Sequence, residues 1–328
     1  ADIAINVGIL LGYAMDRAIN VAWEDEPDTR WRIAMGLSLI MPTAFCLFCY
    51  PFVPESPRWL LSVGRNERAS KSLKQIAPSM TAEQVQLAVS EMNGTLSTST
   101  SSTLSWKASL LPATAAHRYV VAIALMLGLG QQLTGTEAIL YYTPRILNQC
   151  PEGSKEENTE SCMGGNTVFL ITLGVGTCKL VGELVAAVLV EHTGRRITLV
   201  WTNLLLCLAV FLMALQCELE WSTAAGATFL CLIMLFFSLG PGPLTFVVVN
   251  EILPLALRGK VVAAAVFCNR LGSGTIALTF LSLKEAIGVF AAFSLYAILG
   301  VVVTIFYALC VPDLRGRSID ENERAAAS

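Results

Sequence analysis

Long apolar segments recur along the whole chain of 328 residues and are separated by polar loops. A helix of about 20 apolar residues crosses the roughly 30 Å hydrocarbon core of a bilayer, and about eight segments are long enough to do so. With 54% hydrophobic and only 14% charged residues, the composition is not that of an ordinary soluble domain. The sequence therefore predicts an all-α membrane protein. The expected spans lie at about 3–22, 33–53, 119–148, 166–190, 197–216, 224–250, 260–283 and 288–311.

Basic residues are concentrated in alternate loops, and this pattern predicts the orientation of the chain. Loops rich in Lys and Arg face the cytosol, and such loops lie at 54–118, 192–196 and 258–260. We therefore expect both chain ends on the cytosolic side. Cys150 and Cys162 fall in a loop that would then lie outside the cell. Either a disulfide between them or two free thiols is compatible with this location.

The expected spans fall into two unequal groups around one long polar loop. Thr81 and Gln84 are spaced as a capping box that would open a short helix within this loop. Because the chain starts at Ala1 without an initiator Met, and because few spans precede the loop, we expect it to be a piece of a longer protein. The four expected regions are the last two helices of an N-terminal bundle at 1–53, a cytosolic loop with short amphipathic helices at 54–118, a six-helix C-terminal bundle at 119–311, and a cytosolic tail at 312–328.

One long apolar run turns polar at bilayer depth. At about 100° per residue, Gln131, Thr134, Glu137 and Tyr141 share one side of a helix, within an arc of about 120°, and Gln132 is adjacent to them. Polar groups at this depth have to be satisfied by protein, water or a ligand, because lipid offers no hydrogen-bond partner. The pattern predicts a polar stripe that faces a cavity. A polar seam that only joins two helices is the structural alternative.

A second polar stripe and a helix break occur farther along the chain. Lys179 and Glu183 are one turn apart near the middle of the span 166–190, so they face the same cavity or form a purely structural ion pair. The run Gly240-Pro241-Gly242-Pro243 interrupts a later span. Prolines free backbone carbonyls, and such a break is tolerated only where it is buried or lines water. We expect a binding site or hinge there, with a simple kink as the alternative.

The span 260–283 adds an amide and a cation near mid-membrane. Asn269 has the donors and the acceptor needed to bind a hydroxylated ligand. Its neighbour Arg270 requires an acid to neutralise it at this depth. Three acids remain candidates for that partner: Asp2, Glu137 and Glu183.

Acidic and arginine side chains recur together at the cytosolic helix ends. Exposed ion pairs contribute only about 0–1 kcal/mol each, so they stabilise a fold poorly but suit a latch that opens and closes. We expect a cytosolic gate, with ordinary solvated loop charges as the alternative. The candidate residues are Glu55, Arg58, Glu191, Arg195, Arg196, Glu251, Arg258 and Arg315.

Other functional classes find little support in the sequence. No basic tract interleaved with aromatic residues is present to bind nucleic acid. The chain has two histidines, His117 and His192, and both lie near the cytosolic face. No mid-membrane histidine cluster therefore offers a metal site or an activated nucleophile. We expect neither an enzyme nor a cofactor.

Six motifs identify a family resemblance that runs from end to end of the chain. In these motifs the chain resembles the sugar porter family of the major facilitator superfamily. Asn6, Lys179 and Asn269-Arg270, with their neighbours, are similar to plant-type polyol and monosaccharide proton symporters. The resemblance implies a twelve-helix fold in two halves, of which this chain resembles helices five to twelve only. The motifs are PESPRWL (54–60), QQLTGTEAILYYTPR (131–145), EHTGRR (191–196), GPGPLTF (240–246), NEILPLALRG (250–259) and VPDLRGR (311–317).

The resemblance also implies which residues bind the solute and which carry charge inside the membrane. Glu137 replaces an Asn that is usual in the family, Phe246 replaces a Trp, and Lys179 stands where many hexose carriers have Asn. These departures favour a polyol or an inositol over glucose alone. The implied solute contacts are Gln131, Gln132, Glu137, Tyr141, Phe246, Asn269 and Asp2, and the intramembrane charges are Lys179, Glu183 and Arg270.

We therefore expect transport of a sugar or polyol by alternating access, with proton-coupled symport at the plasma membrane in the full-length protein. Amide groups suit such solutes because each bonds two neighbouring hydroxyls, while Tyr141 and Phe246 lie against an apolar ring face. A sugar sensor of the same fold that does not transport, and a facilitative uniporter, are the alternatives. The family's proton-coupling acid belongs to the first four helices, so the residues of this chain do not by themselves show the coupling. Without those helices the cavity would lack one wall, so the fragment alone is expected to be inactive. The expected partners are the polyhydroxylated solute, protons and the lipid bilayer, with no nucleic acid.

Overall fold

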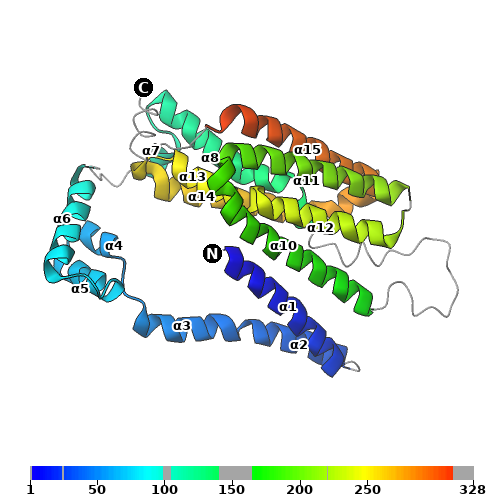
Figure 1. Cartoon of the computed structure of the whole chain (residues 1–328), viewed down its shortest axis with the longest axis horizontal. Helices are drawn as coiled ribbons and strands as arrows, with labels where there is room; N and C mark the ends of the chain where they lie inside the picture. Colours follow the sequence, from blue (N-terminus) through cyan, green and yellow to red (C-terminus); the bar gives the residue numbers. More distant parts are fainter. Residues whose placement is uncertain (1, 24–25, 99–104, 140–164, 220, 313–328) are drawn as a thin grey trace. The chain divides into compact units, whose positions relative to one another are not determined.

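The computed structural model describes residues 2–23, 26–98, 105–139, 165–219 and 221–312, and the regular elements in these ranges are α-helices. The chain forms two compact units (Figure 1). One contains the chain up to Arg17 together with the chain from Trp106 onward, and the other contains Ala18–Ser105. The division falls within α1 (Asp2–Ala22).

The unit Ala18–Ser105 joins one apolar helix pair to three short helices. An apolar contact among Leu60, Leu61 and Ala69 holds the short helices together. The expected capping box is confirmed, because the Thr81 backbone N–H donates to Gln84 Oε1 at 2.9 Å and the Gln84 N–H donates to Thr81 Oγ1 at 3.3 Å. The helices of this unit are α2 (Pro27–Ser38), α3 (Ile40–Phe52), α4 (Pro57–Ser62), α5 (Asn66–Ile76) and α6 (Ala82–Thr98).

The larger unit is a bundle of long helices around an apolar core. Helix α11 packs against α15 and α12, α10 packs against α12, and α8 packs against α14. Leu206, Ile233 and Phe293 are among the fully buried side chains of the core. These helices, labelled in Figure 1, are α7 (Trp106–Leu110), α8 (Ala115–Leu133), α10 (Gly165–Thr193), α11 (Arg195–Glu218), α12 (Thr223–Leu239), α13 (Pro241–Ile252), α14 (Leu255–Ile287) and α15 (Val289–Cys310).

Within the described ranges, seven helical segments are long and apolar enough to cross a membrane, and each matches one of the expected spans. The remaining expected span, 3–22, forms α1 but is not among the seven. Its second half contains Asp16 and Arg17, which lower its mean hydropathy. The seven are Asp28–Cys49, Ala115–Ile139, Thr167–Val190, Arg195–Glu218, Ala224–Ile252, Leu257–Ile287 and Val289–Cys310.

Two helix breaks interrupt the bundle, and each has a local cause. Helix α8 ends before Gly135, whose φ of +73° is in the left-handed region that favours glycine. A Cβ on Gly135 would also lie 2.6 Å from the Tyr296 ring. The second break lies at Gly240 between α12 and α13. Pro241 has no N–H to bond the Phe237 carbonyl one turn earlier, so the helix cannot continue unbroken.

Candidate functional site

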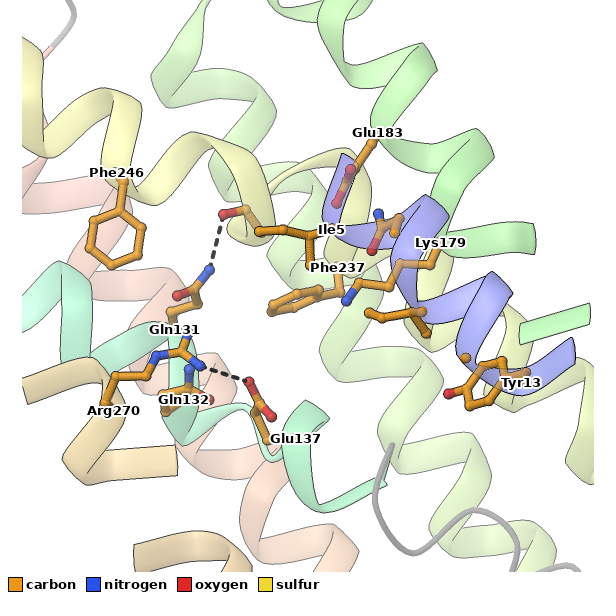
Figure 2. A pocket seen from close by; sticks show the side chains of 14 residues that line it. Ile5, Tyr13, Gln131, Gln132, Glu137, Lys179, Glu183, Phe237, Phe246 and Arg270 are labelled. Atoms are coloured by element: carbon orange, nitrogen blue, oxygen red, sulfur yellow. Dashed lines mark hydrogen bonds and ion pairs between the residues drawn. The ribbon is translucent and has the colours of Figure 1, made fainter. Parts of the chain in front are cut away.

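A cavity of about 710 Å³ opens inside the larger unit, at the level of the two helix breaks (Figure 2). Its volume is in the range of small-molecule sites, about 300–1,000 Å³. Polar, charged and aromatic side chains from α1, α8, α10, α12, α13 and α14 surround it. The lining residues are Ile5, Asn6, Ile9, Gly12, Tyr13, Gln131, Gln132, Glu137, Lys179, Glu183, Phe237, Gly242, Phe246 and Arg270.

Gln131, at the end of α8, is bonded on both ends of its amide. Its Nε2 donates to the carbonyl oxygens of Pro241 at 2.7 Å and Gly242 at 3.0 Å, in the first turn of α13. Its Oε1 accepts a bond of 2.6 Å from Asn269 Nδ2. The side chain therefore connects α8 to α13 and α14 at the wall of the cavity, and Figure 2 shows its bond to α13.

Asn269 does not line the cavity but lies behind the two glutamines of α8. Its side chain is fully buried, at 0% exposure. Its Nδ2 donates to the Gly128 carbonyl at 2.8 Å as well as to Gln131, and its Oδ1 accepts a bond of 3.1 Å from Gln132 Nε2. Asn269 thus fixes the orientation of both amides from α14.

Gln132 lines the cavity, and one polar atom of its amide has no partner. Its Nε2 donates to Asn269 Oδ1. This bond fixes the orientation of the amide, with Oε1 on the side away from Asn269. This oxygen is buried and has no hydrogen-bond partner among the described residues. A hydroxyl donor in the cavity would satisfy it.

Charges of both signs face the cavity. Arg270 NH1 of α14 lies 3.9 Å from Glu137 Oε1, which follows the α8 break, so Glu137, one of the three candidate acids, is a partner of Arg270. This ion pair is loose, and the Arg270 side chain is 63% exposed. Lys179 and Glu183, both on α10, line the cavity as the sequence predicts, and in Figure 2 they lie across it from Gln132.

Aromatic side chains complete the lining. Phe246 of α13 was expected, whereas Phe237 of α12 and Tyr13 of α1 were not singled out from the sequence. Helix α1 also contributes Asn6, again without a prior prediction. The α1 lining positions 5, 6, 9, 12 and 13 have the spacing of one helix face.

Some predicted site residues lie outside the described part of the chain. These are Tyr141, Arg315, and the side chains of Asp2 and Glu191, together with the candidate disulfide residues Cys150 and Cys162.

The predicted gate residues of the larger unit are located apart from the cavity lining. Arg195 NH2, at the start of α11, lies 3.3 Å from Glu251 Oε1 near the end of α13. Arg196 donates to the Ala308 carbonyl of α15, and Arg258 donates to the Leu253 carbonyl at 3.0 Å. The Arg195–Glu251 pair therefore joins two helices. Glu55 and Arg58 belong to the other unit.

A cavity with hydrogen-bonding amides, lined by membrane-crossing helices that break beside it, is typical of solute transporters. A family model described as "Sugar (and other) transporter" matches residues 1–326, so the chain belongs to this family.

Named relatives and solved structures agree with the family. The chain is 30% identical to "Probable polyol transporter 4" of Arabidopsis thaliana, over 98% of this chain and 59% of the relative. It is 26% identical to "Facilitated trehalose transporter Tret1" of Drosophila grimshawi, over 97% of this chain and 32% of the relative. Its fold matches the major facilitator proton:xylose symporter XylE, solved with 6-bromo-6-deoxy-D-glucose, with a TM-score of 0.78 and 24% identity over 99% of this chain.

The match covers only part of the relatives. The chain spans 59% of polyol transporter 4, 66% of "Probable polyol transporter 6" and 65% of the XylE chain. The fold is therefore part of a major facilitator fold.

Proposed function

We propose that this protein moves a polyol or a related polyhydroxylated sugar across a membrane by alternating access. The family and the polyol transporters among its relatives support this class of solute. The cavity adds the chemistry, because amides offer donors and acceptors to hydroxyls, and aromatic rings cover apolar CH faces.

The observation that carries the proposal is the buried, unpartnered Oε1 of Gln132, a residue that lines the cavity. Asn269 fixes this amide so that the acceptor has one orientation before a solute arrives. A fixed acceptor costs a bound solute less ordering than a freely rotating one. Gln131, Glu137 and Phe246 complete the solute contacts that we propose, and Asn269 acts through the glutamines.

Proton-coupled symport is the form of transport that we propose for the whole protein. The related fold of XylE belongs to a proton:xylose symporter. In this chain Glu137 and Glu183 supply carboxylates at the cavity, and Lys179 and Arg270 supply cations beside them. Facilitative uniport is the competing mode.

We also propose a location and a gate. Both chain ends face the cytosol, an orientation that the distribution of basic loop residues favours. The membrane that we propose is the plasma membrane. The Arg195–Glu251 pair closes the cytosolic ends of α11 and α13 in one state and opens in the other.

Transport by the whole natural protein in proteoliposomes tests the proposal. Uptake of radiolabelled sorbitol, mannitol, xylitol, myo-inositol, glucose and xylose is measured with and without an inward proton gradient. We expect saturable uptake of at least one polyol, accelerated by the gradient. Gln132→Leu is expected to raise its KM about tenfold, the effect of losing about 1.4 kcal/mol.

Two results would contradict the proposal. Solute binding without uptake would indicate a sensor, and uptake that ignores the proton gradient would indicate a uniporter. Gln216→Leu is the matched control, because Gln216 is a partly exposed glutamine near the end of α11 that does not line the cavity.

A further inference from the structure

Asn6 of α1 is a buried amide that lines the cavity without a hydrogen-bond partner. Its residue exposure is 1%, and both Nδ2 and Oδ1 are shielded from solvent. Neither atom has a partner among the residues that the structure describes. A buried amide that loses its bonds to water and gains none is strongly unfavourable. The position therefore requires an explanation other than packing.

Other buried amides at this level of the bundle are bonded. Gln131 uses both ends of its amide, and Asn269 uses its nitrogen twice and its oxygen once. Ser238 Oγ is also buried without a partner, but Ser238 does not line the cavity. Asn6 shares with Gln132 the combination of an unsatisfied buried amide atom and a place in the lining of the cavity, but in Asn6 both amide atoms are unsatisfied.

Asn6 lies at the cavity without any bond from its own side chain. Two other side chains of α1 pack against Gly176 of α10, where a Cβ would lie 2.7 Å from Leu10 Cδ2 and 3.4 Å from Tyr13 Cε2. In Figure 2 Tyr13, which follows Asn6 on α1, lies on the Lys179 side of the cavity, away from Gln132. Asn6 belongs to α1 and both glutamines belong to α8, so the amides reach the cavity lining from different helices.

We propose that Asn6 is a solute-binding residue that sets hydroxyl specificity from the α1 side of the cavity. Its Nδ2 donates to one hydroxyl and its Oδ1 accepts from a neighbouring hydroxyl, so it recognises a pair of adjacent hydroxyls. Gln132 Oε1 accepts from a further hydroxyl on the opposite side. The inference rests on the proposed function, and it adds a residue and a specificity to it.

Replacement of Asn6 by Leu separates this role from a structural one. The variant has the same number of side-chain heavy atoms with the same branching, and it removes the unsatisfied amide. In the whole protein in proteoliposomes, we expect KM for the best-transported polyol to rise at least tenfold. Melting temperature without solute is expected to be equal to or higher than that of the wild type, because no hydrogen bond is lost.

Singly deoxygenated analogues of the same polyol supply the specific readout. The wild type is expected to discriminate at least tenfold against the analogues that lack either of two adjacent hydroxyls. Asn6→Leu is expected to lose that discrimination and to keep discrimination at the other positions. Asn6→Ala, assayed by solute-induced shifts in melting temperature, gives the same answer if Asn6→Leu does not reach the membrane.

Asn203→Leu is the matched control. Asn203 is a buried asparagine of α11 whose Nδ2 donates to the Gly300 carbonyl at 3.0 Å and to Thr304 Oγ1 at 2.7 Å, and it does not line the cavity. Its replacement is expected to lower the melting temperature and to leave KM and the analogue pattern unchanged.

The outcomes distinguish the inference from the function on which it rests. Wild-type KM and wild-type discrimination in Asn6→Leu overturn the role of Asn6 while polyol transport stands. A wild-type protein that neither binds nor transports any polyol or sugar of the panel overturns both.

Discussion

Gln131 Nε2 lies 2.7 Å from the carbonyl oxygen of Pro241, so the end of α8 is bonded to α13 immediately beyond the α12–α13 break. The same nitrogen reaches the Gly242 carbonyl at 3.0 Å. A side chain proposed to bind solute therefore also connects two helices of the bundle.

Gln131→Leu is expected to weaken the fold as well as the binding of solute. Each lost hydrogen bond removes about 0.5–1.5 kcal/mol of stability, because the carbonyls and Asn269 lose a partner. A lower melting temperature of the purified protein, together with a raised KM, checks this. An unchanged melting temperature would show that the bonds to α13 contribute nothing in the folded protein.

Asn269→Leu is expected to lower affinity for every solute by a similar factor. The residue is buried behind Gln131 and Gln132 and orients both, so its loss disorders two amides at once. We expect KM to rise roughly tenfold or more, equivalent to about 1.4 kcal/mol. Uptake of the deoxygenated analogues distinguishes this role from direct contact. A selective loss for one analogue would mean that Asn269 touches the solute itself.

Glu137 and Arg270 are expected to contribute little to stability as a pair. Their 3.9 Å separation and the exposure of Arg270 correspond to a coupling of about 0–1 kcal/mol. A double-mutant cycle with Glu137→Gln and Arg270→Gln, read by thermal unfolding at low and high salt, measures it. A coupling well above that range would show that the pair is tighter and less solvated than its geometry indicates.

Gly135→Ala is expected to be strongly destabilising. The left-handed φ of +73° disfavours any side chain, and the new Cβ would lie 2.6 Å from the Tyr296 ring. Together these effects correspond to at least about 2 kcal/mol. Gly274→Ala is the control, because a Cβ there meets nothing within 4 Å and α14 is helical throughout. Equal melting temperatures for the two variants would contradict the account of the α8 break.

The membrane helices were largely predictable from the sequence, because the hydropathy of a segment depends only on its own residues and not on tertiary contacts. The break at Gly240 was visible for a similar local reason, since Pro241 and Pro243 lack N–H donors. The capping box of α6 is local as well. The segment 3–22 marks the limit of this approach, because Asp16 and Arg17 bring α1 close to the boundary between membrane and soluble helices.

The cavity was predictable only in part. Gln131, Lys179 and Glu183 line it, as their helical spacing indicated, whereas Thr134 of the predicted stripe is buried and is not among the lining residues. Glu137 lines it as well, but it follows the break at Gly135, so spacing along one continuous helix does not account for its position. The position of Asn269 behind the glutamines depends on the contact of α14 with α8, which periodicity within one helix does not reveal. The contact of Arg270 with Glu137 likewise depends on how α14 packs against the end of α8, which the sequence of one helix does not reveal. Asn6 was missed as a lining residue because one amide in an apolar helix does not show which neighbour it faces.

Among the described residues that line the cavity, two carboxylates and two cations are present, at Glu137, Glu183, Lys179 and Arg270, and the formal charges of these four cancel. An uncharged solute can therefore bind at the centre of the membrane while these four side chains together carry no net charge. Loss of one of these four side chains would instead leave a net charge at bilayer depth, and that electrostatic cost would be present in the empty cavity and the filled one alike.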